Sequence, residues 1–130
     1  MGNADKADIR KVIEAYGDRL RASDVRGVVD LYTDECAVMT PELETIVGKH
    51  QLTEVYEGHL RDVALNVTFH FEEILADGDL GAAHTTATGT ITPLATGEAA
   101  PARFRELFVL RREGEEWKIA QYMFQSMPVT

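Results

Sequence analysis

The feature that most constrains the fold is a change of periodicity near residue 62. Before it, apolar residues recur at steps of three and four, which is typical of amphipathic helices. After it, apolar and polar residues alternate, most clearly between Val63 and Leu75, which is typical of strands. A chain with helices first and long strands afterwards predicts an α+β fold, in which a twisted sheet curls around the helices.

The first half predicts three helices and one short hairpin. Ile9, Val12, Ile13, Tyr16 and Leu20 share one stripe of the first helix. Ser23 is suited to cap the second helix, whose apolar stripe ends at Tyr32. The expected ranges are 5–22 for the first helix, 36–41 and 42–48 for the two hairpin strands, and 50–61 for the third helix.

The second half predicts four long strands in an antiparallel meander. Asp77-Gly78-Asp79 and Gly114 supply turns between them. The expected strands are 63–75, 80–92, 102–112 and 117–127. We therefore expect three N-terminal helices packed in the concave side of a strongly curved, mainly antiparallel sheet. This cone-shaped α+β barrel leaves a cavity between sheet and helices, and concave sites of that kind commonly bind ligands.

Composition limits the number of domains and the class of partner. A chain of 130 residues with 45% hydrophobic content supports one core, so we expect a single domain over 1–130. The net charge of −9 opposes binding to nucleic acid or anionic lipid. Cys36 has no second cysteine to pair with, and no apolar signal segment is present, so the expected location is cytoplasmic. No spacing typical of a metal site or of a nucleotide cofactor is found.

Four segments together resemble a known family over almost the whole chain. They are ADIRKVIEAYGDRLRASDVRGVVDLYTDECAVMTP, TIVGKHQLTEVYEGHL, EILADGDLGAAHTTATGT and FRELFVLRREGEEWKIAQYMFQS. In order and spacing they resemble the SnoaL-like, or nuclear transport factor 2-like, superfamily. The chain is most similar to its SgcJ/EcaC group, whose members include proteins of enediyne and polyketide antibiotic biosynthesis.

The resemblance implies a pocket but no single reaction, because the superfamily includes isomerases, cyclases, dehydratases and non-catalytic association domains. Compared with the ketosteroid isomerase pattern, the oxyanion-holding tyrosine falls at Tyr16 and the second oxyanion group at Glu106. The catalytic base of that pattern falls at Thr40, which cannot abstract a carbon-bound proton. Isomerisation by the same route is therefore disfavoured.

The resemblance also implies which side chains face the pocket. The candidate catalytic residues are His70, His84, Glu106 and Tyr16. The candidate ligand-binding residues are Thr68, Thr86, Thr88, Phe104, Phe108, Tyr122, Phe124 and Tyr32. Asn66 and Ala120 are expected on the same face. If the strand of Glu106 were turned over, Arg103 and Arg105 would face inward instead.

Each candidate has a structural alternative. His70 and His84 can act as general acid or base, as a pair of histidines does in scytalone dehydratase, or can be ordinary structural histidines. Tyr16 can hold an oxyanion or fill the core. Glu106 can stay protonated among phenylalanines or be an ion-paired acid. The acidic runs 42–44 and 113–116 are interpreted as solvated loop ends, and His50 and His59 as helix surface.

From these residues we expect a small-molecule-binding protein of secondary metabolism. It would bind an aromatic or polyketide-type ligand and act by cofactor-free acid–base chemistry of the cyclase, dehydratase or isomerase type. The alternative is a non-catalytic carrier or dimerisation module. The opposite face of the sheet is expected to carry an apolar patch of Val67, Phe69, Phe71, Leu107, Val109, Ile119 and Met123. Monomers rarely expose such a patch, so we expect a homodimer through it.

Overall fold

The computed structural model describes residues 2–129 and shows the expected order of helices and strands. The helices are α1 (Gly2–Arg21), α2 (Val25–Val29) and α3 (Lys49–Asp62). The strands are β1 (Tyr32–Met39), β2 (Ile46–Val47), β3 (Val63–Asp77), β4 (Leu80–Pro93), β5 (Ala100–Glu113) and β6 (Glu116–Met127).

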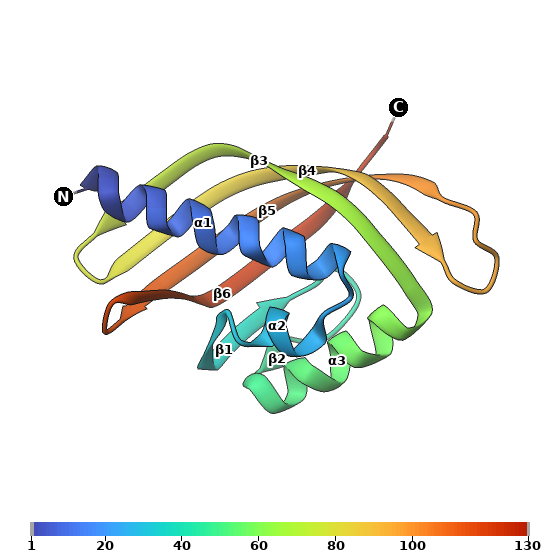
Figure 1. Cartoon of the computed structure of the whole chain (residues 1–130), viewed down its shortest axis with the longest axis horizontal. Helices are drawn as coiled ribbons and strands as arrows, with labels where there is room; N and C mark the ends of the chain where they lie inside the picture. The colour runs from blue at the N-terminus through green and yellow to red at the C-terminus, as the bar shows by residue number, and fades with distance from the viewer. Residues whose placement is uncertain (1, 130) are drawn as a thin grey trace.

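The strands form one curved sheet in the order β2-β1-β6-β5-β4-β3. Neighbours pair antiparallel except β1 and β6, which are parallel. In Figure 1, α1 lies across the concave face of this sheet. Helices α2 and α3 and strands β1 and β2 lie together near the C-terminal end of α1. The predicted α+β fold with a mainly antiparallel sheet is confirmed.

Helix α1 forms because its apolar residues fall on one stripe that the sheet covers. Ile9 and Ile13 are fully buried, and Tyr16 and Leu20 are nearly so. Their spacing keeps all four on the face that packs against β3. This packing places the Tyr16 side chain between helix and sheet.

The predicted second helix is too long, and its cap is displaced by one residue. Ser23 adopts a left-handed φ of 54° and does not cap α2. Asp24 is the N-cap, and its carboxylate accepts a 3.0 Å hydrogen bond from the backbone N–H of Gly27. The helix ends at Val29, so Tyr32 begins β1 instead of ending a helical stripe.

Strands β5 and β6 present most of the expected side chains to the core. Glu106, Phe108 and Tyr122 are buried on the inner face, the side of the sheet that faces α1. A register irregularity after Val109 alters the alternation at the start of β6. It leaves Ile119 fully buried in the core and places Ala120 beside Val109 and Gln121 on the outer side, so the predicted faces of Ile119 and Ala120 are both wrong.

Strands β3 and β4 are turned over relative to the prediction. Their inner face carries Val67, Phe69 and Phe71, which pack against or within the core. Burying these three apolar side chains stabilises the folded state more than burying the polar side chains at the alternate positions would. The side chains that move to the outer face, the side away from α1, are Asn66, Thr68, His70, His84, Thr86 and Thr88.

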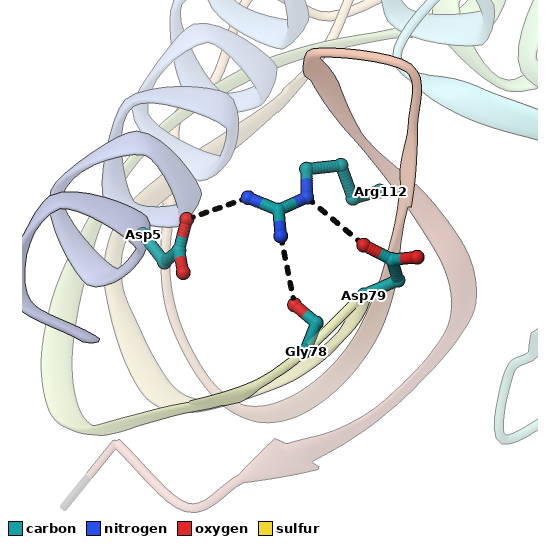
Figure 2. Close-up of polar contacts among 4 residues, drawn as sticks. All are labelled: Asp5, Gly78, Asp79 and Arg112. Atoms are coloured by element: carbon teal, nitrogen blue, oxygen red, sulfur yellow. Dashed lines mark hydrogen bonds and ion pairs between the residues drawn. The ribbon is translucent and has the colours of Figure 1, made fainter. Parts of the chain in front are cut away.

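Arg112 joins three segments at the N-terminal end of α1, as Figure 2 shows. Its guanidinium contacts the carboxylates of Asp5 at 2.9 Å and Asp79 at 3.1 Å. It also donates a 3.2 Å hydrogen bond to the carbonyl of Gly78. The helix, the β3–β4 turn and strand β5 are thus linked by one side chain.

Candidate functional site

A cavity of about 610 Å³ lies between the inner face of the sheet and helices α1 and α3. Its walls are largely apolar and aromatic, and its opening lies beside α3 and the loop after β1. The inner lining includes Tyr16, Leu20, Val38, Ile46, Leu52, Tyr56, Leu65, Val67, Phe69, Ile91, Phe104, Glu106, Tyr122 and Phe124. A few polar groups in an apolar hollow of this size are typical of a small-molecule site.

Glu106 places a carboxyl group in this apolar wall. Its side chain projects inward from β5 and the residue is only 4% exposed. Burial penalises the charged form and raises the pKa of Glu106 to about 7. The Thr85 hydroxyl, on neighbouring β4, donates a 2.7 Å hydrogen bond to Oε1 and opposes that rise. A carboxyl with a pKa near 7 can both donate and accept a proton at neutral pH.

A network of tyrosines adjoins the same cavity. The hydroxyl of Tyr56, on α3, hydrogen-bonds to the hydroxyl of Tyr16 and, at 3.2 Å, to that of Tyr32. Burial raises the pKa of all three hydroxyls, and raises it furthest for Tyr16 and Tyr32. All three therefore remain protonated at neutral pH. Tyr16 and Tyr56 line the cavity, whereas Tyr32 is fully buried behind them.

Aromatic rings form one side of the cavity wall. The ring of Tyr122 stacks on Phe108 with centroids 4.4 Å apart and on Phe124 with centroids 5.6 Å apart. Burial, followed by the neighbouring carboxyl of Glu106, raises the pKa of Tyr122. Phe104 lies edge-on to Phe124. These rings offer flat apolar surfaces to a ligand.

The structure brings together only part of the predicted site. Tyr16, Glu106, Phe104, Tyr122 and Phe124 line the cavity. Phe108 and Tyr32 are fully buried in the core beside it. The predicted inward orientation of the remaining polar residues on β3 and β4 is wrong.

The two candidate histidines lie on the outer face, where they cannot reach the cavity. His70 is exposed and hydrogen-bonds through Nε2 to the hydroxyl of Thr88 at 2.9 Å. His84 is also exposed, and Thr68 and Thr86 lie on the same face. An acid–base pair of His70 and His84 acting in the cavity is therefore ruled out.

Three residues of the site were missed or assigned elsewhere. Thr85 belongs to the face of β4 that was predicted to point outward. Tyr56 was interpreted as helix packing, and His59 as helix surface. His59 lines the cavity opening, and desolvation lowers its pKa despite its exposure. The apolar alternation on β3 could have predicted the inward orientation of Thr85. Thr85 pairs with Phe71, which shares the inner face with Val67 and Phe69, and paired residues point to the same side of a sheet.

A second hollow, of about 670 Å³, lies on the other side of the sheet where β1 meets β6. Its lining is mostly charged or polar and includes Asp34, Glu35, Arg111 and Glu113, all exposed. It lacks the apolar and aromatic walls of the inner cavity. We therefore take the inner cavity as the candidate site.

Two further observations concern metals and membranes. Within residues 2–129, no group of three or more His, Cys, Asp or Glu side chains is placed to hold a metal ion. In the same described part of the chain, no helix combines the length and apolar character needed to cross a bilayer.

Solved structures similar to this chain share the whole fold. A ketosteroid isomerase-like protein from Erwinia carotovora atroseptica has a TM-score of 0.91 and 30% identity, covering 97% of this chain and 98% of its own. A conserved protein from Planctomyces limnophilus has a TM-score of 0.83 and 23% identity, covering 96% and 99%. An NTF2-like protein of unknown function from Pseudomonas putida has a TM-score of 0.78 and 22% identity, covering 96% and 88%.

Sequence comparison assigns the family. No protein of curated function matches this chain. The sequence model of the SnoaL-like domain matches residues 13–122, which contain every lining residue of the cavity except Phe124 and Ser126. With this match and the cone-shaped fold, the chain belongs to the SnoaL-like family of the NTF2-like superfamily.

Proposed function

We propose that this protein binds a small aromatic or polyketide-type molecule in the inner cavity and moves a proton on it through Glu106, without a cofactor. The observation that carries this proposal is the buried carboxyl of Glu106, with its pKa near 7, in a wall of aromatic rings. A carboxyl in such surroundings can donate a hydrogen bond to a carbonyl or phenol oxygen, or take a proton from carbon beside it.

The tyrosines support the same function. The Tyr16 and Tyr56 hydroxyls line the cavity as protonated donors, so they can stabilise negative charge that develops on a ligand oxygen. The similar structure from Erwinia carotovora atroseptica is named as ketosteroid isomerase-like. The resemblance to the SgcJ/EcaC group supports a place in secondary metabolism, with a polyketide or enediyne intermediate as ligand.

A second candidate, non-catalytic binding or carriage, is favoured by Thr40. This residue lines the cavity at the position of the catalytic base in the ketosteroid isomerase pattern. Its hydroxyl is too weak a base to abstract a proton from carbon. If Glu106 does not take over that role, the cavity holds a ligand without converting it.

Proton transfer can be tested without knowing the natural substrate. We expect the protein to accelerate exchange of the α-protons of 2-tetralone in D₂O, followed by NMR. Glu106→Gln keeps a hydrogen-bonding side chain but cannot shuttle the proton, so exchange should fall to the background rate. Glu113→Gln, an exposed change on the same strand, is the matched control and should exchange like the wild type.

Binding of 2-naphthol, measured by its fluorescence, separates the two candidate functions. Naphthol binding with no accelerated exchange would support carriage and overturn catalysis. Absence of both naphthol binding and accelerated proton exchange would overturn the assignment of the cavity as the ligand site. Equal exchange in the wild type and Glu106→Gln would remove Glu106 from the mechanism.

We also propose that two copies pair through the outer face of the sheet. The predicted patch of seven apolar residues is wrong, because Val67, Phe69, Phe71 and Ile119 face the core. A smaller apolar group remains there, made of Leu75, Val109, Leu107 and Met123. The same face carries acids on β3 and Arg103 and Arg105 on β5, so a two-fold pairing can set opposite charges together.

A further inference from the structure

The charges that line the inner cavity are all of one sign. Carboxyl groups of Glu42, Glu54, Asp62 and Glu106 line it, whereas no described lysine or arginine does. His59 is the one imidazole in the lining. Because desolvation lowers its pKa, that ring is mostly neutral at pH 7 and adds no compensating positive charge.

These carboxyls occupy two different depths. Glu106 lies inside, buried, with Oε1 bonded to Thr85 and no described hydrogen bond to Oε2. Glu42, Glu54 and Asp62 are exposed at the opening, on the loop after β1 and on α3. Glu54 pairs with His50 at 3.2 Å, and the described residues provide no ion-pair partner for Glu42 or Asp62.

The opening therefore has a negative electrostatic potential. A ligand experiences this potential when it enters the cavity and, if it reaches the opening, while it is bound. One exposed carboxylate contributes little, but several around a low-dielectric mouth reinforce one another. The net charge of −9 adds to the same field. A carboxylate, sulfate or phosphate on the ligand would be repelled at the opening and would find no cationic partner in the described lining.

We propose that the ligand is a ring compound with an oxygen at its inner end, beside Glu106 and the tyrosines, and a protonated amine at its outer end, in the negative field of the Glu54 and Asp62 carboxylates at the opening. This inference rests on the proposed function and adds the charge class of the ligand. Anionic ligands, including acids and phosphate esters, should bind the site most weakly.

Three hydroxyindoles that share one ring test the charge preference. They are 5-hydroxytryptamine, 5-hydroxytryptophol and 5-hydroxyindole-3-acetate, whose side chains end in an amine, an alcohol and a carboxylate. Isothermal titration calorimetry at low salt measures the three affinities. We expect the amine to bind with an affinity about five-fold or more above that of the alcohol, and the carboxylate to bind most weakly. Added salt should weaken binding of the amine and leave that of the alcohol unchanged.

Variants locate the preference at the opening. The double change Glu54→Gln and Asp62→Asn should remove the advantage of the amine without changing the affinity for the alcohol. Glu57→Gln, an exposed acid of α3 outside the cavity lining, should change neither affinity.

The outcomes separate this inference from the proposed function. If the alcohol binds as tightly as the amine, or the carboxylate binds more tightly than the alcohol, the charge preference is overturned and the cavity remains the ligand site. If none of the three binds, the proposed function itself fails, and the charge preference fails with it.

Discussion

The hydroxyl of Thr85 donates a 2.7 Å hydrogen bond to Oε1 of Glu106 across the paired strands β4 and β5. Both residues are buried, so this bond acts on a carboxyl already shielded from water. It favours the ionised form and holds the pKa of Glu106 below the value that burial alone would set. The proton affinity of the candidate catalytic group is thus tuned by a neighbour on the next strand.

Thr85→Val is expected to raise the pKa of Glu106, because it removes that bond at nearly constant volume. If the ionised carboxylate is the base in α-proton exchange of 2-tetralone, the wild-type rate should rise through about pH 7. In Thr85→Val the midpoint of this pH profile should move to higher pH. Thr86→Val, an outward-facing change on the same strand, is the control and should leave the midpoint in place. A midpoint unmoved by Thr85→Val would contradict the role of the bond.

Glu106→Gln is expected to stabilise the protein at pH 8 and to have little effect at pH 5. In the unfolded chain the carboxyl ionises near pH 4.5, whereas in the folded protein it ionises near pH 7. Between these values the folded state binds more protons, so the free energy of unfolding falls as pH rises from 4.5 through 7. The full loss is at most about 3.5 kcal/mol, at about 1.4 kcal/mol per pKa unit, and less where water enters the cavity.

Urea unfolding at the two pH values measures this difference. The variant lacks the titrating group, so its own stability should vary less with pH than that of the wild type. A stability gain of equal size at pH 5 and pH 8 would show that the effect comes from packing and not from ionisation.

The order of elements could be predicted from the sequence because helical and alternating periodicities are strong and separate in this chain. The boundaries of α3 and of β3 to β6 differ from the prediction by at most two residues, whereas α1 and β1 begin three and four residues earlier than predicted and β2 begins four residues later. The second helix was extended wrongly because Val25, Val28, Val29 and Tyr32 fit a helical stripe although Tyr32 belongs to β1. Local spacing alone does not reveal that Tyr32 pairs with Ile119, a contact distant in sequence.

The faces of the strands were predictable only in part. On β5, Phe104, Glu106 and Phe108 alternate with Arg103, Arg105 and Leu107, and their inward orientation was predicted correctly. On β3, the apolar Val67 and Phe69 indicate the face that packs on the core. The family resemblance instead predicted that the polar face of this strand lines the pocket, and that prediction is wrong. On β4, small residues and threonines occupy both faces, so alternation does not specify its orientation. The register of that strand depends on its partners.

Tyr56→Phe is expected to destabilise the protein more than Tyr32→Phe. The Tyr56 hydroxyl bonds to both other tyrosines, so its removal leaves two buried hydroxyls without that partner. Removal of the Tyr32 hydroxyl leaves the Tyr16–Tyr56 bond intact. We expect losses of about 2–3 kcal/mol and about 1 kcal/mol respectively in the free energy of urea unfolding. Equal losses would contradict a central position for Tyr56.

Asp5→Asn is expected to lower the melting temperature more than Asp79→Asn. Both carboxylates contact Arg112, but the Asp5 side chain is 23% exposed and that of Asp79 is 79% exposed (Figure 2). Solvent screens the more exposed pair more strongly. Glu14→Gln, which breaks the exposed pair with Arg10, is the control and should shift the melting temperature little. A larger shift for Asp79→Asn would contradict this ranking.

Leu107→Glu together with Met123→Glu is expected to convert a dimer to a monomer. These side chains are 44% and 47% exposed and are direct neighbours across β5 and β6 on the outer face. Charged residues there would be buried without partners in a face-to-face pairing, at a cost that a small interface cannot offset. Sedimentation at micromolar concentration should give twice 14.4 kDa for the wild type and 14.4 kDa for the variant. Leu94→Glu, on the loop after β4, should remain dimeric. A wild-type mass of 14.4 kDa would overturn the pairing while leaving the cavity and its chemistry intact, because every group assigned to the site comes from one chain.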